Sequence, residues 1–283
     1  MKKNVIFIIC VKSQHEYLHN KHGGFKYFEY SLNTWKYWCE KNNVELFVYD
    51  TPSNSEHVDH KPTWQRWFDV FNQLDNSKIN YDKIAVVDGS TMIKWDAPNF
   101  FEHTPNGKLS CFRSLENLRW ITEGVDGYNN FFGGFEFKLN NYIDCGFQVF
   151  DIKHKKFLTK LEKFYNEHYD EIMDLQNNKV KRGTDQPVYN YLLQIENVDV
   201  VTDIPPSFML SHLTRFDWFS HNWQLNKDKT PFFIKYGYIW KYMYTISAAD
   251  ALKFLSTDFM PVKFIASDPG SGQPYKEQFD TQG

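Results

Sequence analysis

Apolar segments typical of buried strands alternate with helical patterns through the first two thirds of the chain. Residues 5–11 form a compact apolar run, and apolar side chains at steps of three and four follow it over residues 25–39. Parallel strands need crossover connections, which are usually helices. The alternation therefore predicts an α/β fold with a mostly parallel central sheet and helices on both faces.

The rest of the pattern extends this prediction to residue 250, as one domain. Residues 251–283 are predicted to be a C-terminal extension or linker, and the Gly- and aromatic-rich residues 122–137 a long loop. We predict further helices from Pro62 onward and over residues 157–173 and 185–193, and further strands over residues 44–49, 83–87, 109–112, 146–152, 198–204 and 232–234.

Charge and cysteine usage narrow the class of protein. The net charge is −3, so no general attraction to nucleic acid or to anionic membranes is expected. The apolar run at residues 5–11 is too short for a membrane span or a signal peptide. Four widely spaced cysteines in apolar contexts predict buried thiols in a reducing compartment, and hence a cytoplasmic protein: Cys10, Cys39, Cys111 and Cys145.

The aromatic content of 18% is high for a chain of 283 residues. It favours either an aromatic-rich core or a cleft lined with rings that stack on sugars and nucleobases.

The segment that carries the most chemical information is residues 81–93. Its buried strand runs directly into Asp88 and Gly89. In open α/β sheets, ligands bind beyond the carboxyl ends of the strands. A carboxylate there could hold a divalent cation that neutralises a diphosphate. An Asp-Gly pair is also a common turn, so both interpretations stay open.

Three segments, in order, resemble the GT-A glycosyltransferases, and glycosyltransferase family 8 most closely. Residues 88–101, DGSTMIKWDAPNFF, resemble the DxD region of that family. Residues 142–150, YIDCGFQVF, resemble its F-N-x-G-V-x-V-F strand, and residues 182–190, RGTDQPVYN, its D-Q-x-x-x-N helix start. The resemblance implies a GT-A fold, which is Rossmann-like and binds nucleotide-diphosphate sugars.

The resemblance also implies an activity. It is the transfer of a hexosyl or related sugar from a nucleotide-diphosphate sugar to a glycan, protein or lipid-linked acceptor, with retention of configuration. Asp88, with Gly89 and Ser90, would then lie near the donor ribose and diphosphate. The candidate catalytic residues near the donor sugar would be Asp144, Asp185 and Gln186.

Two of these carboxylates also have simpler interpretations. Asp144 stands where the family usually has Asn, and it could instead be a turn acid at a strand end. Asp185 could be the N-cap of the following helix, which is compatible with a place in the cleft.

The sequence departs from the family at its metal site. Ser90 replaces the second DxD acid, and Lys235 stands where the family has a metal-binding His. Serine is a poor ligand and a protonated lysine cannot be one. Metal dependence is therefore doubtful, and Lys235 with Lys241 could neutralise the diphosphate directly.

The altered metal site leaves two alternatives open. His221 could complete a site for Mn²⁺ or Mg²⁺ with Asp88 and Ser90. Alternatively, the chain could be a catalytically degraded module that still binds nucleotide sugars.

Two further residues are candidates for donor binding. Asp50, at the end of the second predicted strand, could contact the nucleobase or ribose. Arg66 could reach the diphosphate, although a solvated position on the polar side of its helix is the simpler expectation. Residues 120–137 are predicted to form the acceptor cleft or a lid over it. A nucleotidyltransferase is disfavoured, because residues 11–15 lack the glycines of its phosphate-binding loop.

Overall fold

The computed structural model describes residues 2–12, 25, 27–51, 61–114, 118–202, 204, 209–210 and 239–240. The chain divides into two compact units. The first unit comprises Met1–Val11, Phe47–Val87 and Phe100–Pro205, and the second comprises Lys12–Leu46, Asp88–Asn99 and Pro206–Gly283. The predicted boundary at residue 250 lies outside the described residues and stays a prediction.

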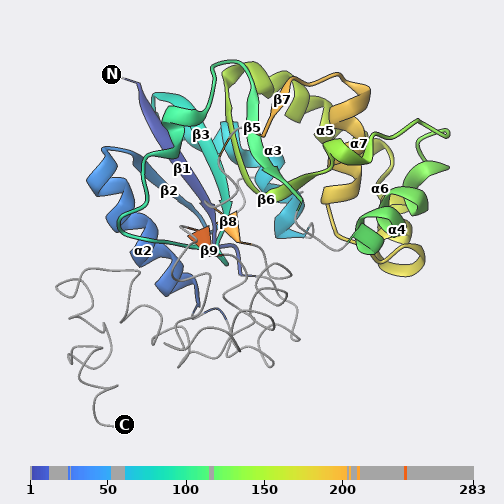
Figure 1. The fold of residues 1–283 in the computed structure, drawn as a ribbon, viewed down its shortest axis with the longest axis horizontal. Helices are drawn as coiled ribbons and strands as arrows, with labels where there is room; N and C mark the ends of the chain where they lie inside the picture. Colours follow the sequence, from blue (N-terminus) through green and yellow to red (C-terminus); the bar gives the residue numbers. More distant parts are fainter. Residues whose placement is uncertain are drawn as a thin grey trace, which may run out of the picture. The chain divides into compact units, whose positions relative to one another are not determined.

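A six-stranded sheet with the order β2-β1-β3-β6-β5-β7 forms the centre of the first unit (Figure 1). β6 is antiparallel to both of its neighbours, whereas β7 is parallel to β5. Backbone hydrogen bonds from Lys3 to Asn80 and from Cys10 to Tyr49 show that β1 is parallel to β3 and β2, because each joins matching strand ends. The mostly parallel sheet is thus confirmed, over β1 Lys3–Ile9, β2 Glu45–Tyr49, β3 Tyr81–Asp88, β5 Leu109–Arg113, β6 Ile143–Asp151 and β7 Val200–Val201.

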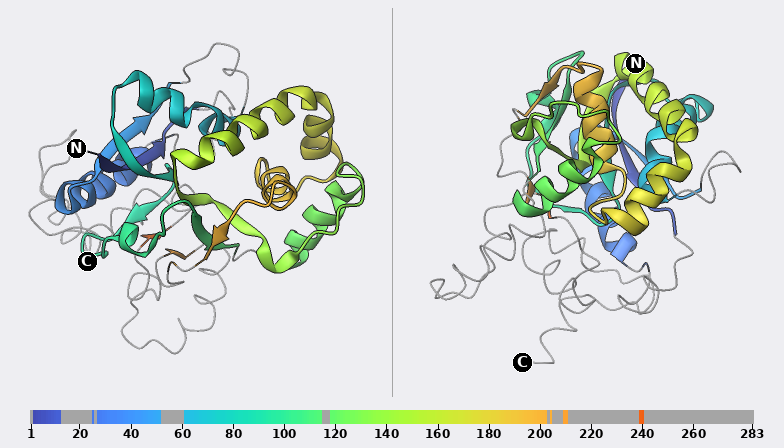
Figure 2. Two further views of the ribbon diagram at one scale, coloured as in Figure 1. Left: turned by 90° about the horizontal axis from the view of Figure 1, so that it is seen from above. Right: turned by 90° about the vertical axis from the view of Figure 1, so that its right-hand side faces the viewer.

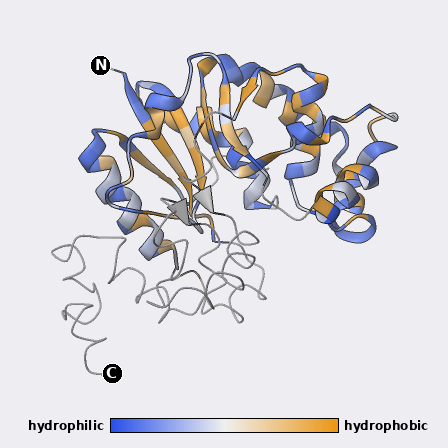
Figure 3. Cartoon of the chain, viewed as in Figure 1, coloured by the Kyte–Doolittle hydropathy of each residue, from blue (hydrophilic) through white to orange (hydrophobic). Residues whose placement is uncertain are grey.

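Both faces of the central strands are buried, as a doubly covered sheet requires. On β1, Phe7 belongs to the main core, and its neighbours Ile6 and Ile8 on the opposite face are buried too. The strands are accordingly the most apolar part of the chain in Figure 3. The main core also takes side chains from α3 Pro62–Asn76, α4 Leu118–Asn129, α5 Lys155–Glu167, α6 Tyr169–Asp174 and α7 Gln186–Ile195. Figure 2 shows the ribbon from two further sides.

Aromatic rings pack around Phe147 of β6. Its ring centroid lies 5.0 Å from that of Phe112 on β5 and 5.0 Å from that of Phe100. Phe100 begins a short 3-10 helix, η2 Phe100–His103. The aromatic cluster thus holds η2, where the chain re-enters the first unit, against the sheet. The other short helices are η3 Leu139–Asn141, η4 Ile152–His154 and the π-helical η5 Leu175–Lys179.

The predicted loop over residues 122–137 is wrong in its first half, because α4 extends to Asn129. Gly124 and Gly127, which suggested a loop, lie inside this helix and allow close packing. A Cβ atom on Gly127 would lie 2.6 Å from both methyl carbons of Val180. Glycine thus lowers helix propensity here but permits the contact with the neighbouring segment.

Two other element predictions differ from the structure. The single helix expected over residues 157–173 is broken at His168, whose ψ of 24° is not helical. The strand expected over residues 198–204 is only Val200–Val201. The strand expected over residues 232–234 lies outside the described residues. Pro62 does begin α3 at the first helical position, as predicted.

The four cysteines are free and buried, as predicted. Burial raises the pKa of the Cys10 thiol to about 12, so this thiol stays protonated at neutral pH. None of the helices within the described ranges is long and apolar enough to cross a membrane.

The second unit contains the helix predicted over residues 25–39, α2 Tyr27–Asn42, and a small sheet of order β4-β9-β8. β9 is antiparallel to β4 and parallel to β8. The strands have two residues each, too short for a sequence pattern to reveal: β4 Met92–Ile93, β8 Met209–Leu210 and β9 Ile239–Trp240.

The aromatic cluster around Phe147 predicts a large effect of truncation. Phe147→Ala should lower the free energy of unfolding by about 3–5 kcal/mol, because a fully buried ring is removed from between two others. Leu139→Ala, at an exposed position, is the matched control and should change it little. Urea unfolding checks both, and equal effects of the two substitutions would contradict this packing.

Candidate functional site

A polar cluster lies at one edge of the sheet in the first unit, where β5 ends and β6 begins. Arg113, the last residue of β5, is opposite Ile143, the first residue of β6. Val87, near the carboxyl end of β3, is opposite Phe147 of the antiparallel strand β6. The first residues of β6 therefore lie at the carboxyl end of β3. This edge is the one at which ligands bind in open α/β folds.

The start of β6 is irregular and holds Asp144. Cys111 pairs with Gln148 and Arg113 pairs with Ile143, so residue 112 of β5 faces residues 144–147 of β6. Within this bulge the backbone N–H of Gly146 donates to Asp144 Oδ1 at 2.6 Å. Asp144 thus lies within the irregular start of β6, where its side chain accepts a local backbone hydrogen bond. Bulges of this kind are frequent beside active sites.

Asp185, directly before α7, is held by α3. Its Oδ2 accepts hydrogen bonds from Arg66 Nη2 at 2.8 Å and from Trp67 Nε1 at 2.6 Å. Its Oδ1 accepts one from the Thr184 hydroxyl at 2.9 Å. The side chains of Arg66 and Asp185 are each only 3% exposed, so this is a buried ion pair.

These contacts correct two expectations. Arg66 is not solvated: it lies among the buried residues of α3, where a guanidinium needs a charged partner. Asp185 occupies the N-cap position of α7, but its side chain makes no capping hydrogen bond. Three donors from elsewhere occupy its carboxylate instead.

Gln186, the first residue of α7, is held only loosely. Its Nε2 lies 3.5 Å from the hydroxyl of Ser114, the residue after β5. One turn later, Asn190 is held firmly: its Oδ1 accepts from Ile143 N at 2.8 Å, and its Nδ2 donates to Ile143 O at 3.0 Å and to Gln186 O at 2.9 Å. The amide of Asn190 thus fixes the start of β6 against α7.

The sequence did not single out the tyrosines of this site. The hydroxyl of Tyr189 donates to Oε1 of the buried Gln148, while Gln148 Nε2 lies 3.3 Å from Asp144 O. Burial raises the pKa of Tyr142 well above its ordinary value. Within the described residues its hydroxyl has no hydrogen-bond partner, although the Gln186 amide acts on its pKa in the opposite direction. No sequence pattern distinguishes such a tyrosine from a core ring.

The predicted donor-binding residues are divided between the two units. Asp50 belongs to the first unit, is exposed, and accepts a hydrogen bond from the Thr51 hydroxyl at 3.1 Å. Asp88, Gly89 and Ser90 belong to the second unit. Lys235, Lys241 and His221 lie outside the described residues. Convergence of all these residues on one diphosphate therefore stays a prediction.

The Asp88-Gly89 pair does form a turn. The backbone N–H and the hydroxyl of Thr91 both donate to Asp88 O, at 3.0 and 2.7 Å. Trp35 Nε1 of α2 donates to the same hydroxyl at 3.0 Å, so α2 anchors the turn within the second unit. The turn interpretation holds for the backbone, and it leaves the role of the carboxylate open.

A divalent cation fits the described residues poorly. Asp88 supplies one carboxylate, and Ser90 is a weak ligand. In the part of the chain that the structure describes, no three His, Cys, Asp or Glu side chains gather as a metal site would need.

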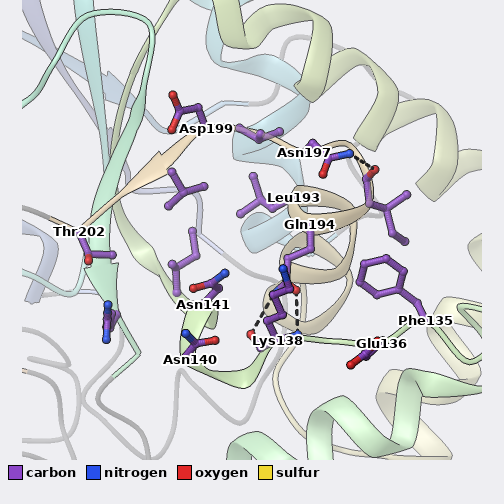
Figure 4. A pocket seen from close by; sticks show the side chains of 15 residues that line it. Phe135, Glu136, Lys138, Asn140, Asn141, Leu193, Gln194, Asn197, Asp199 and Thr202 are labelled. Carbon is purple, nitrogen blue, oxygen red and sulfur yellow. Dashed lines mark hydrogen bonds between the residues drawn. The ribbon is translucent and has the colours of Figure 1, made fainter.

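A pocket of about 510 Å³ lies in the first unit beside the second half of α7 (Figure 4). Phe135 and Glu136 line it and belong to the segment predicted to form the acceptor cleft. One wall is fixed because the Gln194 side chain accepts from Lys138 N at 2.9 Å and donates to Lys138 O at 3.1 Å. Other lining residues are Arg113, Asn140, Asn141, Asn197, Asp199 and Thr202.

The burial of the Arg66–Asp185 ion pair predicts that replacing Arg66 destabilises the protein far more than replacing the exposed Arg119. Arg66→Met should lower the free energy of unfolding by about 3–5 kcal/mol, because the Asp185 carboxylate would stay buried without its counter-ion. Arg119→Met removes an exposed ion pair with Glu123 and should leave the unfolding midpoint nearly unchanged. Chemical denaturation checks both, and a mild effect of Arg66→Met would show that Asp185 is not buried as a charge.

Comparison with known proteins identifies the fold. No protein-family model matches the sequence, and no curated protein matches it. A crystal structure of a glycosyltransferase involved in the glycosylation of the major capsid of PBCV-1 is 9% identical, with a TM-score of 0.52 over 88% of this chain and 97% of that chain. The galactosyltransferase LgtC, in complex with donor and acceptor sugar analogues, is 12% identical, with a TM-score of 0.47 over 91% and 97%. The chain has the mixed α/β fold of the first of these structures, the GT-A type.

Proposed function

We propose that this protein transfers a sugar from a nucleotide-diphosphate sugar to a hydroxyl group of a glycan or other glycoconjugate. The observation that carries the proposal is the hydrogen-bond network that ties Asp185, Gln186 and the strand start at Ile143 and Asp144 to one edge of a GT-A fold. Ligands of open α/β sheets bind at this edge.

Asp185 is proposed to position Gln186 and not to react itself. Its carboxylate already accepts three hydrogen bonds from the protein, so it is a poor general base. It fixes the first turn of α7 against α3 and thereby places Gln186 beside the strand edge. Gln186 is then the residue proposed to contact the donor sugar near its reacting carbon, because its amide is only loosely held.

Asp144 is proposed to lie beside the same sugar. A negative charge there stabilises the positive charge that develops on the sugar as the bond to the diphosphate breaks. In a retaining reaction the acceptor oxygen bonds to the anomeric carbon on the face that the diphosphate leaves. The acceptor proton then passes to the departing phosphate oxygen. In an inverting reaction Asp144 would be the base.

We propose that Asp50 contacts the nucleobase or ribose of the donor, that the Asp88-Gly89-Ser90 turn lies near the donor ribose and diphosphate, and that Lys235 and Lys241 contact the diphosphate. The positive charge of the two lysines would compensate for the missing second DxD acid, since basic groups stabilise a departing diphosphate. Transfer with and without Mn²⁺ or Mg²⁺ would show whether a cation is used, and whether His221 is needed for it.

A second candidate function is a module that binds nucleotide sugars without transferring them. The observation that favours it is Ser90 at the position of a DxD acid. Such a module would bind a donor tightly, and no incubation would release the free nucleotide.

Release of nucleotide from a panel of nucleotide sugars tests the transfer activity. With the donor that reacts, Gln186→Ala should lower kcat/KM about a hundredfold, because a group near the reacting carbon is lost. Asn166→Ala, on the exposed side of α5, is the control and should keep full activity. Absence of release with every donor, with or without Mn²⁺, would contradict the transferase proposal.

The pocket of Figure 4 is proposed to bind the acceptor glycan. Its volume falls in the range of small-ligand sites, and asparagine amides with one aromatic ring suit sugar hydroxyls and faces. Asn141→Ala should therefore raise the KM for the acceptor about tenfold while the donor Kd stays unchanged. A change in donor affinity with an unchanged acceptor KM would place the acceptor elsewhere.

A further inference from the structure

Two tyrosine hydroxyls in the first unit are buried without a hydrogen-bond partner among the described residues. They belong to Tyr142, directly before β6, and Tyr128 of α4, which are 2% and 0% exposed. The large majority of buried side-chain polar atoms in proteins are paired, so each exception needs a physical reason. The two tyrosines differ in their surroundings.

Tyr142 lies beside the loosely held amide. The backbone N–H of Ser114 donates to Tyr142 O at 3.0 Å, and the hydroxyl of the same serine is the group 3.5 Å from Gln186 Nε2. Asn190 joins the next residue, Ile143, to the backbone of Gln186. Tyr128 instead packs its ring against Phe131, and it takes no part in the hydrogen bonds described here for Ser114 and Asn190.

The amide of Gln186 contrasts with the other amides on α7. Asn190 and Gln194 each make two hydrogen bonds of 3.1 Å or less to the backbone of a single residue. The hydrogen bond from Gln186 Nε2 to the Ser114 hydroxyl, at 3.5 Å, is at the long limit for such a bond. The terminal torsion of a glutamine is broadly distributed, so its amide N–H groups can turn toward a neighbouring hydroxyl oxygen without movement of the backbone.

We propose that Tyr142 is a positioning residue that sets the orientation of the Gln186 amide. One Nε2–H of Gln186 donates to the Tyr142 hydroxyl oxygen, and the other Nε2–H then faces outward to donate to an acceptor oxygen of the ligand, on a sugar or a phosphate. This inference rests on the proposed function for the identity of the ligand, but not for the pairing of the two side chains. An N–H donated to the phenol oxygen favours the phenolate, which agrees with the direction in which the Gln186 amide acts on the pKa of Tyr142.

Side-chain NMR of the ligand-free protein tests the pairing directly. Gln186→Glu identifies the Gln186 amide signals by their disappearance. Tyr142→Phe keeps the ring, and so its effect on neighbouring signals, but removes the hydroxyl. We expect Tyr142→Phe to shift the Gln186 amide signals and Tyr128→Phe to leave them in place. Unchanged signals in Tyr142→Phe would overturn the inference.

Thermal unfolding separates positioning from a contribution to the fold. Tyr128→Phe should unfold at or above the wild-type Tm, because it loses no hydrogen bond that the described residues make, whereas Tyr142→Phe should unfold slightly below it, because it loses the one hydrogen bond to Gln186. A Tm for Tyr142→Phe far below that of Tyr128→Phe would contradict the inference, since the hydroxyl would then support the fold itself.

Binding of UDP-glucose, UDP-galactose, UDP-N-acetylglucosamine and GDP-mannose by calorimetry completes the test. With the probe that binds, Tyr142→Phe should raise Kd about tenfold in the wild type and not at all in Gln186→Ala, whereas Tyr128→Phe should change neither. Equal effects of Tyr142→Phe in both backgrounds would overturn the inference. If none of the probes binds the wild type, the proposed function fails, and the Gln186 amide signals alone decide the pairing.

Discussion

The ion pair between Arg66 and Asp185 is the interaction on which the rest of the site depends. It joins α3 to the start of α7 on one face of the sheet, with Trp67 as a second donor. We infer that this buried pair contributes more to specificity of position than to net stability. It fixes where α7 begins, and Asn190, one turn later, then fixes where β6 begins. Gln186 lies between these two anchors.

The contrast between satisfied and unsatisfied polar groups indicates where a ligand would act. Asp185, Asn190 and Gln148 use their polar atoms within the protein, so they form a framework. Gln186 and Tyr142 are left with weak or missing hydrogen bonds among the described residues. An unpaired buried polar atom lowers the stability of the fold. Two side chains with such weak or missing hydrogen bonds, Gln186 and Tyr142, are therefore unusual beside residues whose polar atoms are all paired. We infer that the framework holds the site in place and that Gln186 and Tyr142 are the groups that respond to a ligand.

Sequence periodicity predicted the sheet well because buried strands and amphipathic helices carry strong apolar patterns. It failed at α4, where Gly124 and Gly127 reflect close packing on Val180 rather than a loop. The site was predicted only in part. Asp144, Asp185 and Gln186 were found through motif resemblance, but the pairing of Arg66 across 119 positions could not be, because spacing along a chain does not encode it. The buried Tyr142 gave no signal for the same reason.

The central claim is that the edge formed by the start of α7 and the start of β6 holds the sugar of a nucleotide-diphosphate donor. A crystal structure with a bound nucleotide sugar tests it most directly. We expect a sugar oxygen to lie within hydrogen-bond distance of Gln186 Nε2 while the Arg66–Asp185 pair stays closed. A sugar bound away from this edge, or an Asp185 carboxylate turned from Arg66 onto the ligand, would contradict it.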